Sequence, residues 1–510
     1  MTMPTASSMR ASGGDVGEQP LPDRSLQDLL MIEDDPAILE YRCTRTDVLL
    51  WPLIRVVMLR VIMSDLFYGT SLDGLSAERP ISGRAATTLL RSLVRNARSR
   101  RAPRADVCIV SSAVANQFVD GAWYNRLTDP FALMHPAGTL TIEEPFEWQW
   151  HEPRHHDNIR HFAPRLAMGV LVGRMRVSRS HRRNAAALVD IVLSRARAGL
   201  GWECAPSRRA QVIEMLARKA AALPTQYAAF ESMLTDVRPR VLLVTAGCYG
   251  PASPLLVAAN RRGITTAEYQ HGAVSSGHDA YNVSPALAHD ARYRESLPRF
   301  FLGYGSWWNA QFNSPMTRIV IGNPHRERQL ARVVRRATTR RTLLVLSDGI
   351  EFDKYVELAE AMAVKCGPLG FDVVLRPHPL ERSMAGERHG ATIGAVTVDP
   401  EVDLYASLAS AYAVISEVST GLFEAVGIAD RVMVWDTPKA RFGYPVHPFE
   451  RFTTIDTLTR LLAQDDAGRL GATELEAIWA SDWQAKYAAF LAAAGVTATS
   501  ASTDDARRRS

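Results

Sequence analysis

The chain has 510 residues, a formal net charge of +5 and 47% hydrophobic residues, which is enough apolar material for two or three domains. Its five cysteines show no paired spacing, so neither a disulfide scaffold nor a cysteine metal site is expected, and a cytoplasmic setting is favoured. The basic excess is nearly all arginine and comes without a nucleic-acid-binding motif, so no nucleic-acid partner is expected.

Residues 1–104 precede the regular part of the chain. Residues 1–24 lack the apolar core of a signal peptide and are predicted to form a disordered leader. Residues 25–104 are predicted to be a helical region with a basic linker, because apolar side chains recur near helical period after Pro52. The most hydrophobic stretch, 48–67, contains charged residues and is not expected to cross a membrane.

The segment 84–104 holds seven arginines and no acidic residue, and its apolar side chains fall on one helical side: Leu89, Leu90, Leu93 and Val94. A basic amphipathic helix of this kind can lie on an anionic bilayer, where each surface arginine adds on the order of 1 kcal/mol. A solvated linker helix accounts for the pattern equally well. The sequence therefore leaves open a peripheral contact of 84–104 with the inner face of the plasma membrane.

Residues 105–330 are predicted to form a Rossmann-like, acceptor-side domain. A strand is expected at 106–110 and another at 241–245. A helix at 254–262 and a strand at 265–269 follow, and this strand–helix–strand unit predicts a parallel pair with a right-handed crossover.

Two other stretches of this domain carry charge or histidine without a clear site. The very basic stretch 174–217 has a helical pattern and is predicted to form a solvated face or a lid. The histidine-rich segment 148–165 lacks the spacing of a metal-binding helix. No metal is expected.

Residues 331–440 are predicted to form a second Rossmann-like domain, because strands and helices alternate from 342–346 onwards. Residues 441–496 are predicted to be helices that pack back on the first domain, and 497–510 a disordered tail. The predicted fold class is α/β, with two facing Rossmann-like domains behind a helical N-terminal extension.

Ligands of open parallel sheets bind beyond the carboxyl ends of the strands, so polar residues that follow predicted strands are the site candidates. His271 follows the strand at 265–269, and an imidazole can take a proton from an attacking hydroxyl near neutral pH. A hydrogen-bonded core histidine is the alternative. The neighbours expected to form a substrate-side loop are Gln270, Gly272, Ser275, Ser276 and His278.

A second cluster follows the predicted strand at 373–375. Pro377 and Pro379 fix an extended exit from this strand, which places Arg376 and His378 on the same side of the chain. Arginine can grip a phosphate with two N–H groups, and histidine can donate a proton. A rigid turn with a solvent-facing histidine is the alternative.

Phosphate binding is also predicted where a helix begins in the second domain. Backbone N–H groups at Ser419, Thr420 and Gly421 could seat a phosphate, and Glu424 could accept ribose hydroxyls. Ordinary helix capping is the alternative. Asp348 and Gly349 follow the first strand of this domain, where a carboxylate could orient a nucleotide or simply form a turn.

The order of these clusters resembles that of bacterial GT-B-fold glycosyltransferases, which build capsules and lipopolysaccharide. It is also similar to the CDP-glycerol glycerophosphotransferases of teichoic acid synthesis. The pair His378 and Pro379 is shared with capsular Kdo transferases and bacterial sialyltransferases. The resemblance covers roughly 106–435, and Ser347 stands where sialyltransferases have an acidic residue.

The resemblance implies a metal-independent transferase with His271 as the base and no cofactor besides a nucleotide-sugar co-substrate. It further implies that Arg376 and His378 stabilise the leaving phosphate and that Ser419 and Thr420 hold it. The implied acceptor is a growing surface polysaccharide or a lipid-linked glycan. A glycerophosphotransferase, a sugar-nucleotide epimerase of the same fold and a non-catalytic polysaccharide-assembly protein are the alternatives.

Overall fold

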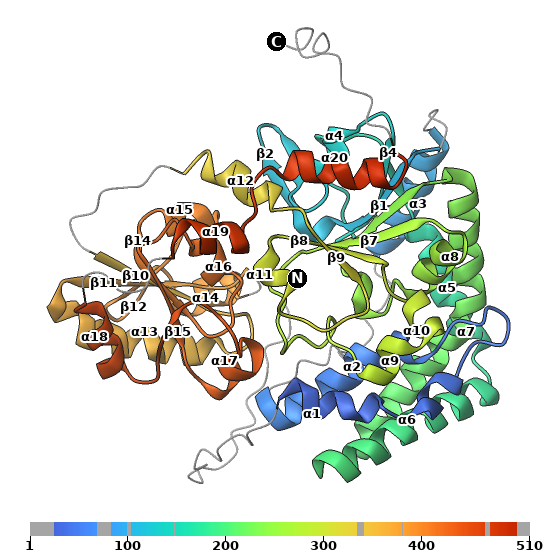
Figure 1. The fold of residues 1–510 in the computed structure, drawn as a ribbon, viewed down its shortest axis with the longest axis horizontal. Coiled ribbons are helices and arrows are strands. Elements are labelled where there is room, and N and C mark those ends of the chain that lie inside the picture. The colour runs from blue at the N-terminus through green and yellow to red at the C-terminus, as the bar shows by residue number, and fades with distance from the viewer. Residues whose placement is uncertain are drawn as a thin grey trace, which may run out of the picture.

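The computed structural model describes residues 25–68, 83–98, 104–146, 148–333, 341–379, 381–464 and 470–496. These residues form two α/β lobes that lie side by side, each built on a seven-stranded sheet (Figure 1). The expected fold class, α/β with two facing Rossmann-like domains, is confirmed. The predicted leader 1–24 and tail 497–510 lie outside the described residues.

The first sheet has the strand order β5-β4-β1-β6-β7-β8-β9, and all of its pairings are parallel. The strand order reverses at β1, because β4 is added on one side of it and β6 on the other. The strand ends around β1, β6 and β7 therefore form the crevice where ligands of doubly wound sheets bind. Its strands are β1 Val107–Ser112, β4 Thr139–Glu144, β5 Ile159–His161, β6 Val241–Val244, β7 Thr265–Tyr269, β8 Phe300–Gly303 and β9 Thr317–Val320. A separate hairpin joins β2 Asn116–Val119 to β3 Ala122–Asn125.

Helices cover this sheet on both faces. The two longest are α6 Arg179–Leu200 and α7 Pro206–Val237; both α6 and α5 (Ala163–Arg176) pack on α7. The basic stretch 174–217, predicted to be a solvated face or a lid, is a packed layer with one solvated face and not a lid. Its arginines lie largely exposed, whereas its inner side chains are almost inaccessible: Leu188, Val189, Val192, Leu216 and Ala217. The shorter helices are α4 Asp129–Met134, α8 Ser253–Arg261, α9 Pro285–His289, α10 Ala291–Glu295 and α11 Ser306–Asn309.

The N-terminal helices belong to the first lobe. α1 (Leu26–Leu30) contacts α6, and α2 (Trp51–Met63) packs on α7 with most of its side chains buried. Buried Arg55 of α2 donates to Glu33 and to the backbone carbonyl of Asp279 at 2.7 Å, so α2 is tied to a loop near the site. α3 (Gly83–Arg98) follows on the same lobe. In the described part of the chain, no helix is both long and apolar enough to span a bilayer.

The second sheet has the order β12-β13-β11-β10-β14-β15-β16, parallel except between β12 and β13. Its strands are β10 Arg341–Leu346, β11 Phe371–Arg376, β12 Thr392–Ile393, β13 Val396–Val398, β14 Ala411–Ser416, β15 Arg431–Trp435 and β16 Glu450–Phe452. Its helices are α13 Phe352–Cys366, α14 Arg382–His389, α15 Leu404–Leu408, α16 Gly421–Ala425, α17 Pro438–Gly443 and α18 Ile455–Leu462. Since β16 pairs with β15, this lobe extends beyond the predicted boundary at 440.

The chain crosses between the lobes twice. It leaves the first lobe after α12 (Pro324–Leu330) and returns with α19 (Ala472–Ile478) and α20 (Trp483–Ala493), shown in red in Figure 1. The Tyr487 ring of α20 lies 4.7 Å from that of Phe131 in the first lobe. Of the segment 441–496, α19 and α20 contact the first lobe, whereas β16 and α18 stay with the second lobe.

Candidate functional site

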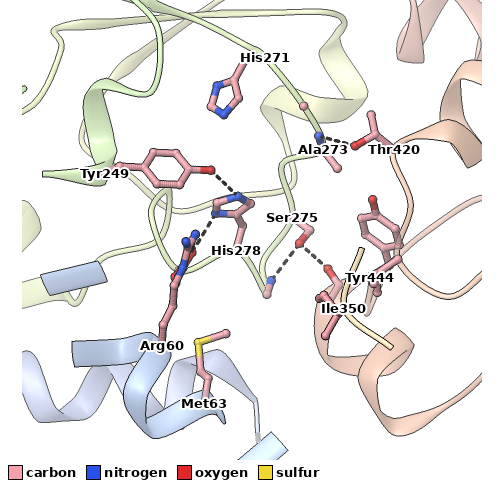
Figure 2. A pocket seen from close by; sticks show the side chains of 15 residues that line it. Arg60, Met63, Tyr249, His271, Ala273, Ser275, His278, Ile350, Thr420 and Tyr444 are labelled. Atoms are coloured by element: carbon pink, nitrogen blue, oxygen red, sulfur yellow. Dashed lines mark hydrogen bonds and ion pairs between the residues drawn. The ribbon is translucent and has the colours of Figure 1, made fainter. Parts of the chain in front are cut away.

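Two cavities lie side by side where the lobes meet. The first, called here the His271 cavity, has a volume of about 430 Å³ and is lined by His271, His278, Tyr249 and Arg60 of the first lobe. Figure 2 shows these side chains facing Thr420 and Tyr444 of the second lobe. The wall from the second lobe puts this cavity between the two sheets.

The second cavity, called here the His378 cavity, has a volume of about 300 Å³. It is lined by His378 and Ser419 from the second lobe and by Arg126 from the first. Val418 and Thr420 line both cavities, so the two adjoin. The structure thus brings the predicted His271 and His378 clusters to one place.

His271 is held by a short relay of polar groups. The Tyr281 hydroxyl donates to buried Glu268 Oε1 at 2.6 Å, and its oxygen lies 3.3 Å from His271 Nδ1. Since the Tyr281 proton is directed to the carboxylate, Nδ1–H can donate to the Tyr281 oxygen. The lone pair of Nε2 is then free to accept a proton in the cavity.

Burial sets the charge of this imidazole. Burial lowers the pKa of His271 to about 4, with smaller contributions from the neighbouring His278 and Arg126. The ring is therefore neutral near pH 7, as a general base must be before it accepts a proton. Glu268 behind Tyr281 is fully buried, and that burial raises the pKa of its carboxyl.

His278 has a different place in the same cavity. Its Nδ1 accepts the backbone N–H of Ala280 at 3.2 Å, and its Nε2 lies 3.1 Å from the Tyr249 hydroxyl. Both ring nitrogens are engaged, so His278 shapes the cavity wall and is not available as a base. Arg60 of α2 pairs with Asp279 at 2.6 Å beside it and brings a cation to the cavity rim.

The rest of the predicted substrate-side loop divides into two groups. Gln270 is fully buried and donates to the Gly272 carbonyl at 2.9 Å while accepting from Tyr304, so it holds the loop and does not face a substrate. Ser276 is exposed and is absent from both cavity linings, which corrects its prediction.

Gly272 and Ser275 do line the His271 cavity. Ser275 donates to the Gly443 carbonyl of the second lobe. The backbone N–H of Ala273 donates to the Thr420 hydroxyl at 3.3 Å. This loop is therefore a contact between the lobes as well as a cavity wall.

Arg376 does not fit its predicted role as a phosphate ligand. Its Nη1 donates to Asp399 at 2.5 Å and to Ser407 at 2.8 Å, and its Nη2 donates to the Val402 carbonyl at 2.9 Å. The side chain is buried, and its N–H groups hold the loop after β13 in place. His378 lines the His378 cavity together with Arg376 but is only half-buried, and burial lowers the pKa of its imidazole.

Asp348 is likewise held by its own lobe. Its carboxylate lies 2.7 Å from Lys439 Nζ, which also contacts Glu417 at 2.7 Å, and these charges raise the pKa of Lys439. A carboxylate paired in this way is not free to act as a base. Gly349 has φ +84°, and a Cβ there would lie 2.6 Å from His378 Nδ1, so a glycine is needed for the close approach of the imidazole.

The start of α16 (Gly421–Ala425), predicted to bind a phosphate through its backbone N–H groups, offers less to an anion than the sequence suggested. α16 has five residues, and the N–H of Gly421 already donates to Ser419 Oγ at 3.2 Å. So short a helix contributes little dipole. Ser419, Thr420 and Glu424 nevertheless line the His378 cavity, and burial raises the pKa of the Glu424 carboxyl.

Arg126 brings a cation from the first lobe that sequence reasoning missed. It follows β3 in a turn where Asn125 Oδ1 accepts the backbone N–H groups of Leu127 at 3.1 Å and Thr128 at 3.3 Å. Within the described chain its guanidinium has no hydrogen bond or ion pair. It lines the His378 cavity, and its charge lowers the pKa of His271 and opposes the rise in the pKa of Glu424.

Some of the missed residues carried a visible signal. Glu268 is a lone charge in a buried strand three residues before His271, and such a charge needs a partner. Asn125 with Asp129 marks a turn before α4 and so exposes Arg126. Tyr249 and Arg60 come from distant segments and could not be placed without the fold. Over the described residues, no group of three or more His, Cys, Asp or Glu side chains could hold a metal ion.

No family model and no curated protein matches the chain. Solved structures are similar at low identity. A putative UDP-N-acetylglucosamine 2-epimerase from Listeria monocytogenes is 12% identical over 76% of this chain and 96% of its own, with a TM-score of 0.41. The glycosyltransferase SnogD from Streptomyces nogalater is 11% identical over 79% of this chain and 100% of its own, with a TM-score of 0.34. The wall teichoic acid polymerase TagF is 10% identical over 83% of this chain and 95% of its own, with a TM-score of 0.35.

Proposed function

We propose that this protein is a glycosyltransferase that uses a nucleotide-sugar donor. The supporting observation is the pair of adjoining cavities between the lobes. One contains the neutral imidazole of His271, and the other contains the cation of Arg126 with His378 and Ser419. A hydroxyl acceptor beside the base and a donor phosphate beside the cation fit this division of charge.

The chemistry of the transfer follows from this arrangement. The acceptor oxygen forms a bond to the anomeric carbon while the bond from that carbon to the donor phosphate breaks. The acceptor proton passes to His271 Nε2, and Tyr281 and Glu268 stabilise the resulting imidazolium through Nδ1. The negative charge that develops on the leaving phosphate is stabilised by Arg126, with hydrogen-bond donors such as His378.

The acceptor class is part of the proposal. We infer a hydroxyl on a growing surface polysaccharide or a lipid-linked glycan, as the order of the sequence motifs implies. Room for an acceptor distinguishes this function from that of an epimerase, which converts one nucleotide sugar without a second substrate. The volume of about 430 Å³ beside His271, separate from the His378 cavity, supports a two-substrate reaction.

A donor screen tests the proposal. Thermal unfolding is measured with CMP-, CDP-, UDP-, GDP- and dTDP-linked sugars and with CDP-glycerol, since a ligand at 100 times its Kd stabilises the folded state by about 2.7 kcal/mol. We expect one nucleotide class to raise the melting temperature and product to form only when a glycan acceptor is added. Product from the donor alone would indicate an epimerase, CDP-glycerol as the donor would indicate a glycerophosphotransferase, and no response to any nucleotide would contradict the proposal.

A further inference from the structure

α3 packs on the first lobe through its polar side. Trp150 Nε1 donates to Ser92 Oγ at 2.9 Å, and Asn96 Nδ2 donates to the His161 carbonyl at 2.8 Å. Thr88 donates to the Trp148 carbonyl on the same side. A surface helix normally turns its apolar side to the core and its polar side outward. α3 does the reverse.

The apolar side of α3 consequently faces outward. Leu90 is 63% exposed, Leu93 54% and Val94 41%. Four arginines stand on the same helix, which has no acidic residue: Arg84, Arg91, Arg95 and Arg98. The expectation that these leucines share one helical side is met, and the structure adds that this side is not buried by the described residues.

α5, which contacts α3, also turns apolar side chains outward and has arginine as its only kind of charged residue. Its Gly169 and Gly173 lie against α7, where a Cβ on Gly173 would come within 2.6 Å of the Arg218 carbonyl oxygen. That contact fixes the rotation of α5 and turns another apolar stripe outward: Met168 54%, Leu171 47% and Met175 76% exposed. Its charged residues are again all arginines: Arg165, Arg174 and Arg176.

The two helices therefore share a surface, called here the α3–α5 surface, whose apolar members are Leu90, Leu93, Val94, Met168, Leu171 and Met175. In Figure 1 it lies on the side of the first lobe away from the second lobe, so an occupant there would not obstruct the cavities. Exposed apolar clusters with a polar rim mark sites where a partner binds.

Charge decides between occupants. A second copy of this surface would bring arginines against arginines, with no acidic residue on either helix to pair with them. An anionic bilayer offers an apolar interior for the leucine and methionine side chains and phosphate headgroups for the guanidinium groups. We propose that the α3–α5 surface binds the interface of an anionic lipid bilayer, with both helices lying in its plane.

Vesicle co-sedimentation of the full chain tests this proposal, and it does not depend on the transferase reaction. Wild-type protein is mixed with phosphatidylcholine vesicles with and without phosphatidylglycerol. We expect binding to the anionic vesicles and a loss of binding at high salt, because the arginine contribution is screened. Equal partition onto neutral and anionic vesicles, or onto neither, would overturn the proposal.

Matched variants separate this surface from the rest of the molecule. The triple variant Leu90→Ser, Leu93→Ser and Met175→Ser should bind anionic vesicles about tenfold more weakly or worse, whereas Val364→Ser, at a residue 73% exposed on α13 of the second lobe, should bind like wild type. Arg91→Gln and Arg176→Gln should each weaken binding to anionic vesicles about fivefold. Arg460→Gln on α18 should leave this binding unchanged.

Two outcomes would contradict the assignment of the surface. Unchanged partition of the triple variant, with a melting temperature equal to that of wild type, would show that lipid binds elsewhere. A wild-type dimer that dissociates in the triple variant, without vesicle binding, would assign the surface to a second copy of the chain.

Discussion

Two side chains determine what the site can do. His271 is neutral because burial disfavours its charged form, and the relay through Tyr281 to Glu268 leaves Nε2 for the acceptor. Arg126 of the same lobe lines the adjoining cavity, and its guanidinium has no protein partner among the described residues. An unpaired cation beside a cavity is available to an anionic ligand, whereas Arg376 is fully used by its own lobe.

The pH dependence of turnover follows from the lowered pKa of His271. A base works in its deprotonated form, so activity is present above the pKa of the folded protein and is lost as the pH falls through about 4. We expect kcat/KM to be flat between about pH 6 and 8 and to decline only in more acidic buffer. A decline centred near the ordinary histidine value, about 6.5, would show that the base is solvated and is not this imidazole.

Replacement of Arg126 tests the phosphate contact. Arg126→Ala should lower kcat/KM for the nucleotide-sugar donor by about 100-fold, because a preorganised donor to the leaving group is lost. The melting temperature should stay close to that of wild type, since the guanidinium has no partner among the described residues to lose. Arg183→Ala, on the exposed side of α6, is the control and should leave both values unchanged. Equal effects of the two substitutions would remove Arg126 from the site.

At the level of elements, the sequence predicted most strands of both sheets because they are short apolar runs bounded by turns, such as 241–244 and 265–269. The features of these elements that the sequence did not predict depend on tertiary contacts. The apolar side chains of the basic stretch 174–217 are buried because α6 and α7 pack on each other. Arg376 is structural because the loop after β13 folds over it. Arg60 reaches the site because α2 docks beside the loop at 279–282.

The docking of α2 depends on a buried ion pair, which a substitution can test. Arg55→Met leaves Glu33 buried without its partner and should lower the free energy of unfolding by about 3–5 kcal/mol. The comparison is Arg42→Met, which breaks an exposed pair with Asp47 and should cost less than about 1 kcal/mol. Chemical denaturation measures both. Similar losses in the two variants would mean that α2 is not held by this pair.

The whole molecule works as two lobes that touch at several places, one of which is the loop at 273–277. Elsewhere the Trp308 ring of the first lobe lies 4.3 Å from the Phe423 ring of the second, and Arg326 donates to the Val426 carbonyl. Ser275 and Ala273 bond to the second lobe, and a Cβ on Gly277 would lie 1.9 Å from the Phe442 carbonyl oxygen. Closure of such lobes excludes water and aligns two substrates. The sequence predicted two facing domains, but it could not show this contact, because its paired residues are 147 to 168 positions apart in the chain.

Gly277→Ala should hold the lobes apart. The added methyl group cannot fit against the Phe442 backbone, so we expect a larger radius of gyration in solution scattering and a kcat reduced by about tenfold or more. Gly199→Ala is the control, because a Cβ there meets nothing within 4 Å. Unchanged scattering and kcat in Gly277→Ala would show that the contact is not part of the active arrangement.

The most direct test of the central claim is single-turnover sugar transfer by His271→Ala with the donor found in the screen. If this imidazole is the base, the variant still binds the donor, as its thermal shift will show, while the rate of transfer falls by about 100-fold or more. His289→Ala, an exposed histidine of α9 in the same lobe, keeps the wild-type rate. Transfer by His271→Ala at the wild-type rate would contradict the proposed site.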